Sequence, residues 1–328
     1  MLGTGKIGDS ATSGRPLDTL AVVLDEPERL RVDRLRLVAP GPEDVVVDVE
    51  WSGISTGTER LLWSGRMPPF PGLGYPLVPG YESVGRVAAA GPRAGRRPGE
   101  RVFVPGAHCH EGVRGLFGGA SAKLVVPGKR VAPLPDSLAE DGVLLALAAT
   151  AVHALHATHA QPPDLIVGHG VLGRLLARLA VGAGAKPVVW ERNADRASGA
   201  EGYAVVHPDA DPRRDYRCIY DVSGDAAILD SLVARLAPGG EIVLAGFYAE
   251  RLSFAFPAAF MKEARLRVAA EWKPEDLAAA QVLVASGRLS LAGLVTHREA
   301  ATRAPDAYRT AFTDPSCLKM VLDWRACA

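Results

Sequence analysis

The segment from Asp164 to Asn193 has the residue types and spacing of a dinucleotide-binding unit. A short apolar strand, Leu165 to Val167, runs into the sequence GHGVLG, and an apolar helix opens directly on these glycines. In a G-x-G-x-x-G turn the first glycine makes the tight turn, the second lets the backbone approach a pyrophosphate, and the third lets helix and strand pack closely. Unpaired N–H groups at the start of the helix then bind the phosphates. We therefore predict that the cofactor is contacted by Gly168, Gly170, Val171, Leu172 and Gly173.

A second apolar strand, Pro187 to Trp190, ends at the carboxylate of Glu191, about 20 residues beyond the glycines. A carboxylate there accepts hydrogen bonds from the adenosine ribose hydroxyls and repels a 2′-phosphate, which favours NAD over NADP. Arg192 follows at once and offers a guanidinium to a phosphate, so NADP remains the alternative. On the same sheet edge, after later strands, we expect further cofactor contacts from Ser223, Gly246 and Phe247.

Length, charge and cysteine content limit the class of protein. The chain has 328 residues, enough for two domains, and its 37 Lys and Arg equal its 37 Asp and Glu, so no overall field draws it to nucleic acid. Four scattered cysteines without C-x-x-C spacing indicate a reducing compartment. Residues 1–16 lack the apolar region of a signal peptide, and the longest apolar run, Val143 to Val152, is about half a membrane span. We predict a cytoplasmic protein without an integral membrane segment; loose association with a membrane stays open.

The pattern of apolar runs and of Pro and Gly turns changes twice along the chain. Up to about residue 135 short apolar runs alternate with Pro and Gly turns, which predicts a compact β-barrel domain. From Asp136 a long Ala/Leu helix is expected to run through Ala157, and strands then alternate with helices, as in a doubly wound parallel sheet. Near residue 290 the pattern changes again. We predict an α/β protein with a β-barrel domain at residues 1–140 and 288–328 and a nucleotide-binding domain at 141–287.

Several short segments resemble the medium-chain dehydrogenase/reductase superfamily. SGIS at 52–55 is similar to its G-[IV]-C segment, PGYESVG at 79–85 to its G-H-E-x-x-G turn, GERV at 99–102 to its G-[DE]-R-V strand, TAVHAL at 150–155 to its T-A-x-x-A-L helix, and PGG at 238–240 to a turn in its nucleotide domain. The resemblance covers nearly the whole chain. It implies a GroES-like catalytic domain, a Rossmann domain, and alcohol oxidation with a nicotinamide nucleotide.

The same resemblance places the family's catalytic zinc ligands at residues that do not suit zinc. Ser55 stands where the cysteine would be, Tyr81 where the histidine would be, and Ala146 near the third ligand. A catalytic zinc needs about three protein ligands, and Glu82 alone survives, so we predict a site without metal. The run AHCHE at 107–111 replaces the family's structural-zinc lobe. We interpret it as a surface cluster, because side chains adjacent in sequence point in different directions.

Without a metal, a side chain must stabilise the alkoxide and take up the proton of the alcohol. The candidates are Ser55, Thr58, Tyr81, Glu82 and His153. Tyr81 with Glu82 would form a relay in which the carboxylate orients or deprotonates the phenol. The alternatives stay open: Tyr81 as a packing aromatic, Glu82 as the anchor of a loop or an arginine, and His153 as a packed or surface histidine.

Three long segments, 51–85, 101–127 and 307–324, resemble one branch of the superfamily. That branch works in bacteriochlorophyll biosynthesis and oxidises a 1-hydroxyethyl group on a tetrapyrrole ring to an acetyl group with NAD. The resemblance therefore implies a chlorophyllide-type substrate, and Arg60 and Arg66 are available to its propionate. Aromatic surfaces suit a flat macrocycle, unless they only seal the core of the domain. We expect substrate contacts from Glu59, Trp63, Phe70, Tyr75 and Phe117.

Two other functions compete with this interpretation. Superfamily members without zinc often reduce quinones or enones with NADPH, although Glu191 disfavours that cofactor. A non-catalytic dinucleotide-binding sensor or scaffold would bind the nucleotide without turnover. A homodimer through the edge of the nucleotide-domain sheet is common in this superfamily and is expected here on that ground alone.

Overall fold

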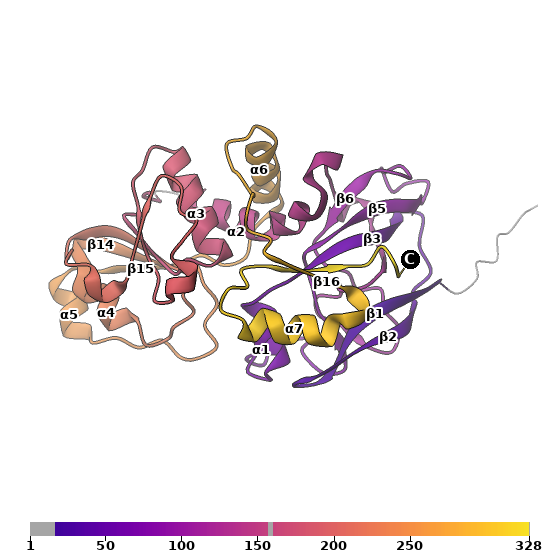
Figure 1. The fold of residues 1–328 in the computed structure, drawn as a ribbon, viewed down its shortest axis with the longest axis horizontal. Coiled ribbons are helices and arrows are strands. Elements are labelled where there is room, and N and C mark those ends of the chain that lie inside the picture. Colours follow the sequence, from indigo (N-terminus) through magenta and orange to yellow (C-terminus); the bar gives the residue numbers. More distant parts are fainter. Residues whose placement is uncertain (1–16, 157–159, 328) are drawn as a thin grey trace, which may run out of the picture.

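The computed structural model describes residues 17–156 and 160–327, and it contains two sheet-based bodies placed side by side (Figure 1). Residues 1–16, the predicted lead-in, and Ala157, the predicted end of the long helix, lie outside the described residues. The first body consists mainly of β-strands, and the second alternates strands with helices. The chain is therefore an α/β protein with a GroES-like β domain and a doubly wound domain, which confirms the predicted fold class.

The first body is built from two sheets. One has the order β2-β1-β4-β7 and the other the order β16-β17-β3-β5-β6-β9, with β8 also paired to β3. Because β3 pairs with β5, β8 and β17, most of its 11 residues are buried. The strands are β1 Leu17–Glu26, β2 Arg29–Leu37, β3 Asp44–Ile54, β4 Leu77–Val78, β5 Ser83–Ala90, β6 Arg101–Val104, β7 Arg114–Gly115, β8 Lys123–Pro127, β9 Ala132–Pro133, β16 His297–Ala300 and β17 Met320–Asp323.

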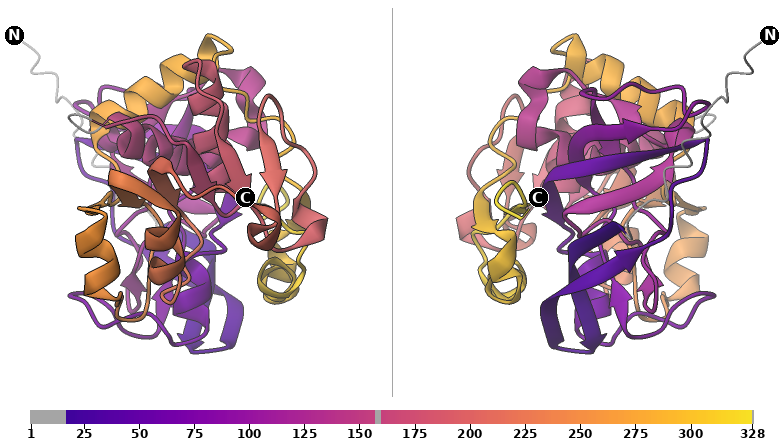
Figure 2. Two further views of the ribbon diagram at one scale, coloured as in Figure 1. Left: turned by 90° about the vertical axis from the view of Figure 1, so that its left-hand side faces the viewer. Right: turned by 90° about the vertical axis from the view of Figure 1, so that its right-hand side faces the viewer.

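The C-terminal segment packs on this first body (Figures 1 and 2). Strand β17 runs antiparallel to β3 with Val321 opposite Gly53. Helix α7, Ala304–Thr313, buries Tyr308 and Phe312 in the same core. The indole N–H of Trp324 donates a hydrogen bond of 2.8 Å to the Ser52 hydroxyl. This arrangement brings residues near 308 and 319 next to residues near 55 and 82.

The second body has six parallel strands in the order β12-β11-β10-β13-β14-β15. Val167 lies opposite both Trp190 and Asp221, so β10, β11 and β13 end at the same level of one sheet edge. Ligands of doubly wound sheets bind at this carboxyl edge. The strands are β10 Leu165–Val167, β11 Val188–Trp190, β12 Ala204–Val206, β13 Tyr216–Asp221, β14 Leu236–Leu244 and β15 Arg265–Val268; the helices are α2 Leu145–His156, α3 Val171–Gly182, α4 Leu229–Arg235, α5 Phe256–Met261 and α6 Pro274–Ala285.

The long helix predicted from Asp136 is divided in the structure. Its first part, Asp136–Leu144, is a 3₁₀ segment in which Ala139 has a φ of 42°, and α2 begins only at Leu145. The stretch Asp136–His156 is long and apolar enough to cross a membrane, but 56% of its most apolar window is buried within the protein. Helix α2 contacts α3 and α6. Its apolar composition therefore fits a core helix.

Candidate functional site

The glycine turn has the geometry that the sequence predicts for a dinucleotide cradle. Strand β10 ends at Val167, and Gly168 turns the chain with a φ of +104°. A Cβ on Gly173 would lie 1.9 Å from the Gly168 carbonyl oxygen, so only glycine allows this contact between turn and helix. A Cβ on Gly170 would meet nothing within 4 Å. Open space at this backbone, at the start of helix α3, fits a pyrophosphate.

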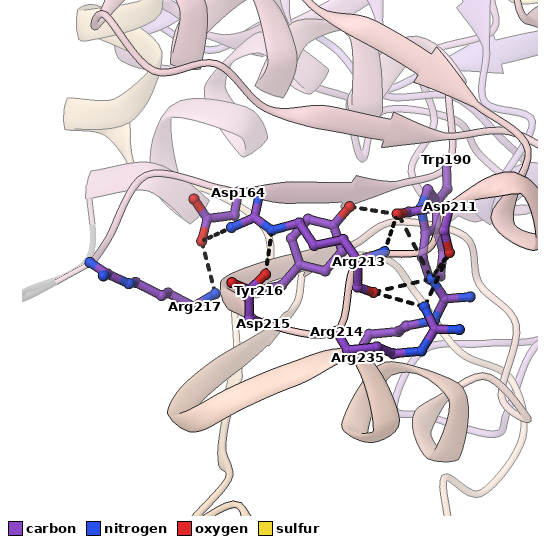
Figure 3. Close-up of polar contacts among 9 residues, drawn as sticks. All are labelled: Asp164, Trp190, Asp211, Arg213, Arg214, Asp215, Tyr216, Arg217 and Arg235. Carbon is purple, nitrogen blue, oxygen red and sulfur yellow. Dashed lines mark hydrogen bonds and ion pairs between the residues drawn. The ribbon is translucent and has the colours of Figure 1, made fainter.

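Glu191 lies directly beside this turn. Its Oε2 accepts a hydrogen bond of 3.1 Å from the His169 backbone N–H, and its Oε1 accepts one of 2.8 Å from the Asn193 backbone N–H. The side chain of the preceding residue, Trp190, is fixed because its indole N–H donates a hydrogen bond of 2.7 Å to buried Asp211 (Figure 3). Asp211 also accepts a bond of 2.6 Å from the Tyr216 hydroxyl. The carboxylate is thus held at the cofactor edge.

The loops after β13 and β14 share that edge and carry the other predicted cofactor residues. The Ser223 backbone N–H donates to Asp221 Oδ1 at 2.9 Å, and the Gly246 backbone N–H donates to the Asp221 carbonyl at 3.0 Å. Phe247 is 53% exposed. Tyr248, which the sequence analysis missed, donates from its hydroxyl to Asp221 Oδ2 at 2.7 Å. Through these hydrogen bonds, buried Asp221 links the loop after β13 to the loop after β14.

The structure brings four of the predicted catalytic and substrate residues together in the first body. The Tyr81 hydroxyl donates to Ser55 Oγ at 2.8 Å and lies 3.5 Å from Thr58 Oγ1. The Phe117 ring meets the Tyr81 ring edge-on, with centroids 5.2 Å apart. Burial, and then the charge of Glu82, raise the pKa of the Tyr81 phenol well above its ordinary value. The phenol therefore keeps its proton at neutral pH.

The predicted relay from Tyr81 to Glu82 is wrong as a direct contact. Glu82 is fully buried, and its Oε2 accepts a bond of 2.6 Å from the Lys319 ammonium, which also donates to the Ile54 carbonyl at 3.3 Å. A Cβ on Gly53 would lie 2.3 Å from Glu82 Oε2, so glycine at that position leaves room for the carboxylate. Glu82 therefore anchors a lysine. This resembles the alternative in the sequence analysis, in which Glu82 anchors a loop or an arginine.

Glu59 does not line an open substrate surface, and this expectation is corrected. It is 1% exposed on α1, Thr58–Trp63, a short helix that the sequence analysis missed. Its Oε2 accepts a bond of 2.7 Å from the Tyr308 hydroxyl, while its Oε1 is buried without a hydrogen-bond partner. Burial raises the pKa of the Glu59 carboxyl from 4.5 to about 8, and the charge of Glu82 adds to this effect.

The other substrate candidates divide into packed and accessible aromatics. The Trp63 ring packs on Phe312 with centroids 5.5 Å apart, and the Tyr75 hydroxyl donates to the Leu62 carbonyl at 2.6 Å. These contacts tie both side chains to the core of the domain and support the alternative that they seal that core. Phe70 is exposed in the loop after α1. Phe70, and Phe117 beside Tyr81, stay as candidates for substrate contact.

His153, on α2, makes its side-chain hydrogen bond to a residue outside this cluster. Its Nδ1 is 2.8 Å from Asp276 Oδ2, and Asp276 also accepts a bond from the Lys273 backbone N–H at the start of α6. The histidine therefore joins α2 to α6 inside the second body. This contact supports the alternative that His153 is a packed histidine.

The donor set at the predicted zinc position does not suit a metal. Among residues 17–156 and 160–327, no group of three or more His, Cys, Asp and Glu side chains is placed to hold an ion. Ala146 is buried on α2, and Glu82 is already paired with Lys319. In the AHCHE run His110 is buried, not on the surface, and burial lowers the pKa of its imidazole to about 4.

Comparisons with known proteins agree with this architecture. Residues 41–136 match the family model of the alcohol dehydrogenase GroES-like domain. Two relatives named 2-desacetyl-2-hydroxyethyl bacteriochlorophyllide A dehydrogenase, from Rhodobacter capsulatus and Cereibacter sphaeroides, are each 58% identical over 94% of this chain and 99% of their own. An alcohol dehydrogenase from Escherichia coli CFT073, solved in complex with NADH, has a TM-score of 0.78 at 22% identity and covers 93% of this chain and 99% of its own. All three proteins are named as dehydrogenases, and the one of known structure was solved with NADH.

Proposed function

We propose that this chain, which belongs to the medium-chain dehydrogenase/reductase family of 2-desacetyl-2-hydroxyethyl bacteriochlorophyllide A dehydrogenases, oxidises the 3-(1-hydroxyethyl) group of a (bacterio)chlorophyllide a to 3-acetyl. The proposal includes NAD as the cofactor and a site without catalytic zinc. The observation that carries it is the 58% identity that extends over 94% of the chain. An aligned stretch of that extent spans both bodies.

NAD is favoured by the charge at the ribose end of the cofactor edge. The Glu191 carboxylate is fixed by two backbone N–H groups and would repel a 2′-phosphate. The Gly168 turn, open at Gly170, would hold the pyrophosphate, and the loops at Ser223 and Gly246 would flank the nicotinamide half. Once bound there, NAD supplies the acceptor for the hydride of the alcohol.

The proton of the alcohol is handled by the hydroxyl cluster around Tyr81. Because the Tyr81 O–H is donated to Ser55 Oγ, a lone pair of the phenol oxygen is free to accept the substrate O–H. As the alcohol proton moves to Tyr81, the phenol proton moves to Ser55 Oγ and the Ser55 hydroxyl releases its own proton to solvent water, so one proton leaves the site and neither a phenolate nor an oxonium remains. Phe117 packs edge-on against the Tyr81 ring and limits where that ring can turn. Proton transfer through a positioned group of this kind contributes about 10²–10⁴-fold to a rate.

Tyr81→Phe is expected to lower kcat at least tenfold, because the variant loses the group that accepts the alcohol proton. The dissociation constant for NADH should stay within about twofold, since the cofactor edge lies in the other body. Tyr75→Phe is the matched control: its hydroxyl only bonds the Leu62 carbonyl, and its turnover should remain near that of the unmodified enzyme. Equal turnover in the two variants would remove Tyr81 from the mechanism.

The function is tested by incubating the purified protein with 3-hydroxyethyl-chlorophyllide and either NAD or NADP. Formation of the 3-acetyl product with NAD, followed by absorbance and chromatography, supports the proposal. No spectral change with either cofactor would reject it, and quinone reduction with NADPH in its place would favour a reductase. Metal analysis completes the test, because stoichiometric zinc in active enzyme would contradict the zinc-free site.

We also propose a homodimer through the outer edge of the parallel sheet, where β15 has a neighbour on one side only. Val268 on this strand is 72% exposed, and Phe256, Phe260 and Met261 on nearby α5 are 65–76% exposed. Exposed apolar surface of this kind marks association sites. Light scattering should give the mass of two chains, and Val268→Arg should shift it towards one chain. A single-chain mass for the unmodified protein would reject the dimer.

We propose a cytoplasmic location without an integral membrane segment. The burial of 56% of the most apolar window in Asp136–His156 supports this placement. The balanced charge of the chain gives no support to a nucleic-acid partner.

A further inference from the structure

An ion pair joins the two loops that flank the glycine turn. Arg192 Nη1 lies 3.4 Å from Asp225 Oδ2; Arg192 follows β11 and Asp225 follows β13. Strand β10, which leads into the turn, lies between β11 and β13 in the sheet. The pair therefore connects the two sides of the nucleotide-binding edge, next to Glu191.

Asp225 is held in place by its own loop. Its backbone N–H donates to Ser223 Oγ at 3.1 Å, and its Oδ1 accepts from the Ala227 backbone N–H at 3.0 Å. Oδ2 is the oxygen that meets Arg192. The Asp225 side chain is 35% exposed, whereas that of Arg192 is 67% exposed. A fixed carboxylate thus meets a guanidinium on a long and accessible side chain.

The charge of Arg192 matters because it adjoins the residue that receives the adenosine ribose. A 2′-phosphate near Glu191 would need a nearby cation, and arginine is suited to bind phosphate with two parallel hydrogen bonds. Arg192 is the residue directly after Glu191. An unpaired Arg192 would attract a 2′-phosphate and so weaken the discrimination against NADP that the Glu191 carboxylate provides.

We infer that Asp225 is a specificity-determining residue, which pairs with Arg192 and so withholds that guanidinium from a 2′-phosphate. Discrimination against NADP then rests on two carboxylates from two loops: Glu191 repels the phosphate, and Asp225 occupies the cation that would attract it. This inference rests on the proposed use of NAD and adds a residue that the glycine fingerprint does not include.

Direct binding of two small probes tests the inference without turnover. Calorimetry would measure the dissociation constants of 2′,5′-ADP and 5′-AMP, which differ only in the 2′-phosphate. Asp225→Asn should tighten 2′,5′-ADP about tenfold and leave 5′-AMP nearly unchanged, because a freed guanidinium gains a charge-assisted bond to the phosphate. The gain should shrink at high salt.

Two further variants separate pairing from a general change in charge. Asp195→Asn removes one negative charge from the same region, but Arg192 is not bonded to Asp195; it should change the affinity for 2′,5′-ADP less than about twofold. Adding Arg192→Gln to Asp225→Asn should abolish the gain. Equal gains in the two aspartate variants, or a gain that persists without Arg192, would overturn the inference.

The unmodified protein distinguishes this inference from the proposed function. If it binds 2′,5′-ADP more tightly than 5′-AMP, the proposed preference for NAD fails, and the role of Asp225 fails with it. If it prefers 5′-AMP and Asp225→Asn changes nothing, the preference for NAD stands and the role of Asp225 alone is rejected.

Discussion

Lys319→Ala is expected to lower the free energy of unfolding by about 3–5 kcal/mol. The Lys319 ammonium and the Glu82 carboxylate are 2.6 Å apart, and their side chains are 1% and 0% exposed. Removing the ammonium would leave the carboxylate buried without an opposite charge, and its Oε1 already has no hydrogen-bond partner. Urea denaturation followed by circular dichroism measures the change.

A surface lysine provides the matched control. Lys123 pairs with Asp48, but both side chains are partly exposed, so Lys123→Ala should cost no more than about 1 kcal/mol. The double variant Glu82→Gln, Lys319→Met removes both buried charges and should recover most of the lost stability. This variant remains informative if Lys319→Ala does not fold. An equal loss in the two alanine variants, or no recovery in the double variant, would contradict the assigned role of the pair.

The cofactor edge could be predicted from the sequence because its geometry is local. Consecutive residues build the strand, the glycine turn and the helix, and the structure places the start of α3 at Val171 and Glu191 against the His169 backbone. The spacing of about 20 residues between turn and carboxylate reflects one helix and one strand. The fold class followed from the same alternation of strands and helices, together with the resemblance in the first domain.

The buried contacts that join the first domain to the C-terminal segment could not be predicted in this way. Glu59 and Tyr308 are 249 residues apart in sequence, and Glu82 and Lys319 are 237 apart, so their contacts depend on how the C-terminal segment packs. Helix α1 has only 6 residues, too few for a periodic pattern. The sequence analysis therefore expected a substrate contact from Glu59, whereas the structure directs that carboxyl into the core.

The free energy of unfolding is expected to fall between about pH 4.5 and 8, and Glu59→Gln is expected to remove this fall. In the unfolded chain the Glu59 carboxyl ionises near its ordinary pKa of 4.5, whereas burial raises its pKa in the folded protein to about 8. Between these values the unfolded state binds fewer protons than the folded state, so stability falls as pH rises. A shift of this size corresponds to about 5 kcal/mol above pH 8.

Glutamine is neutral at every pH and keeps an oxygen that can accept the Tyr308 hydroxyl. At pH 4 the carboxyl is mostly protonated in both states, so the variant and the unmodified protein should have similar melting temperatures. At pH 8.5 the variant should melt several degrees higher. Glu250→Gln is the control, because the Glu250 side chain is 70% exposed and its removal should leave the pH dependence unchanged. If Glu59→Gln follows the unmodified protein across this range, the Glu59 carboxyl titrates in the folded protein as it does in the unfolded chain, and burial does not raise its pKa.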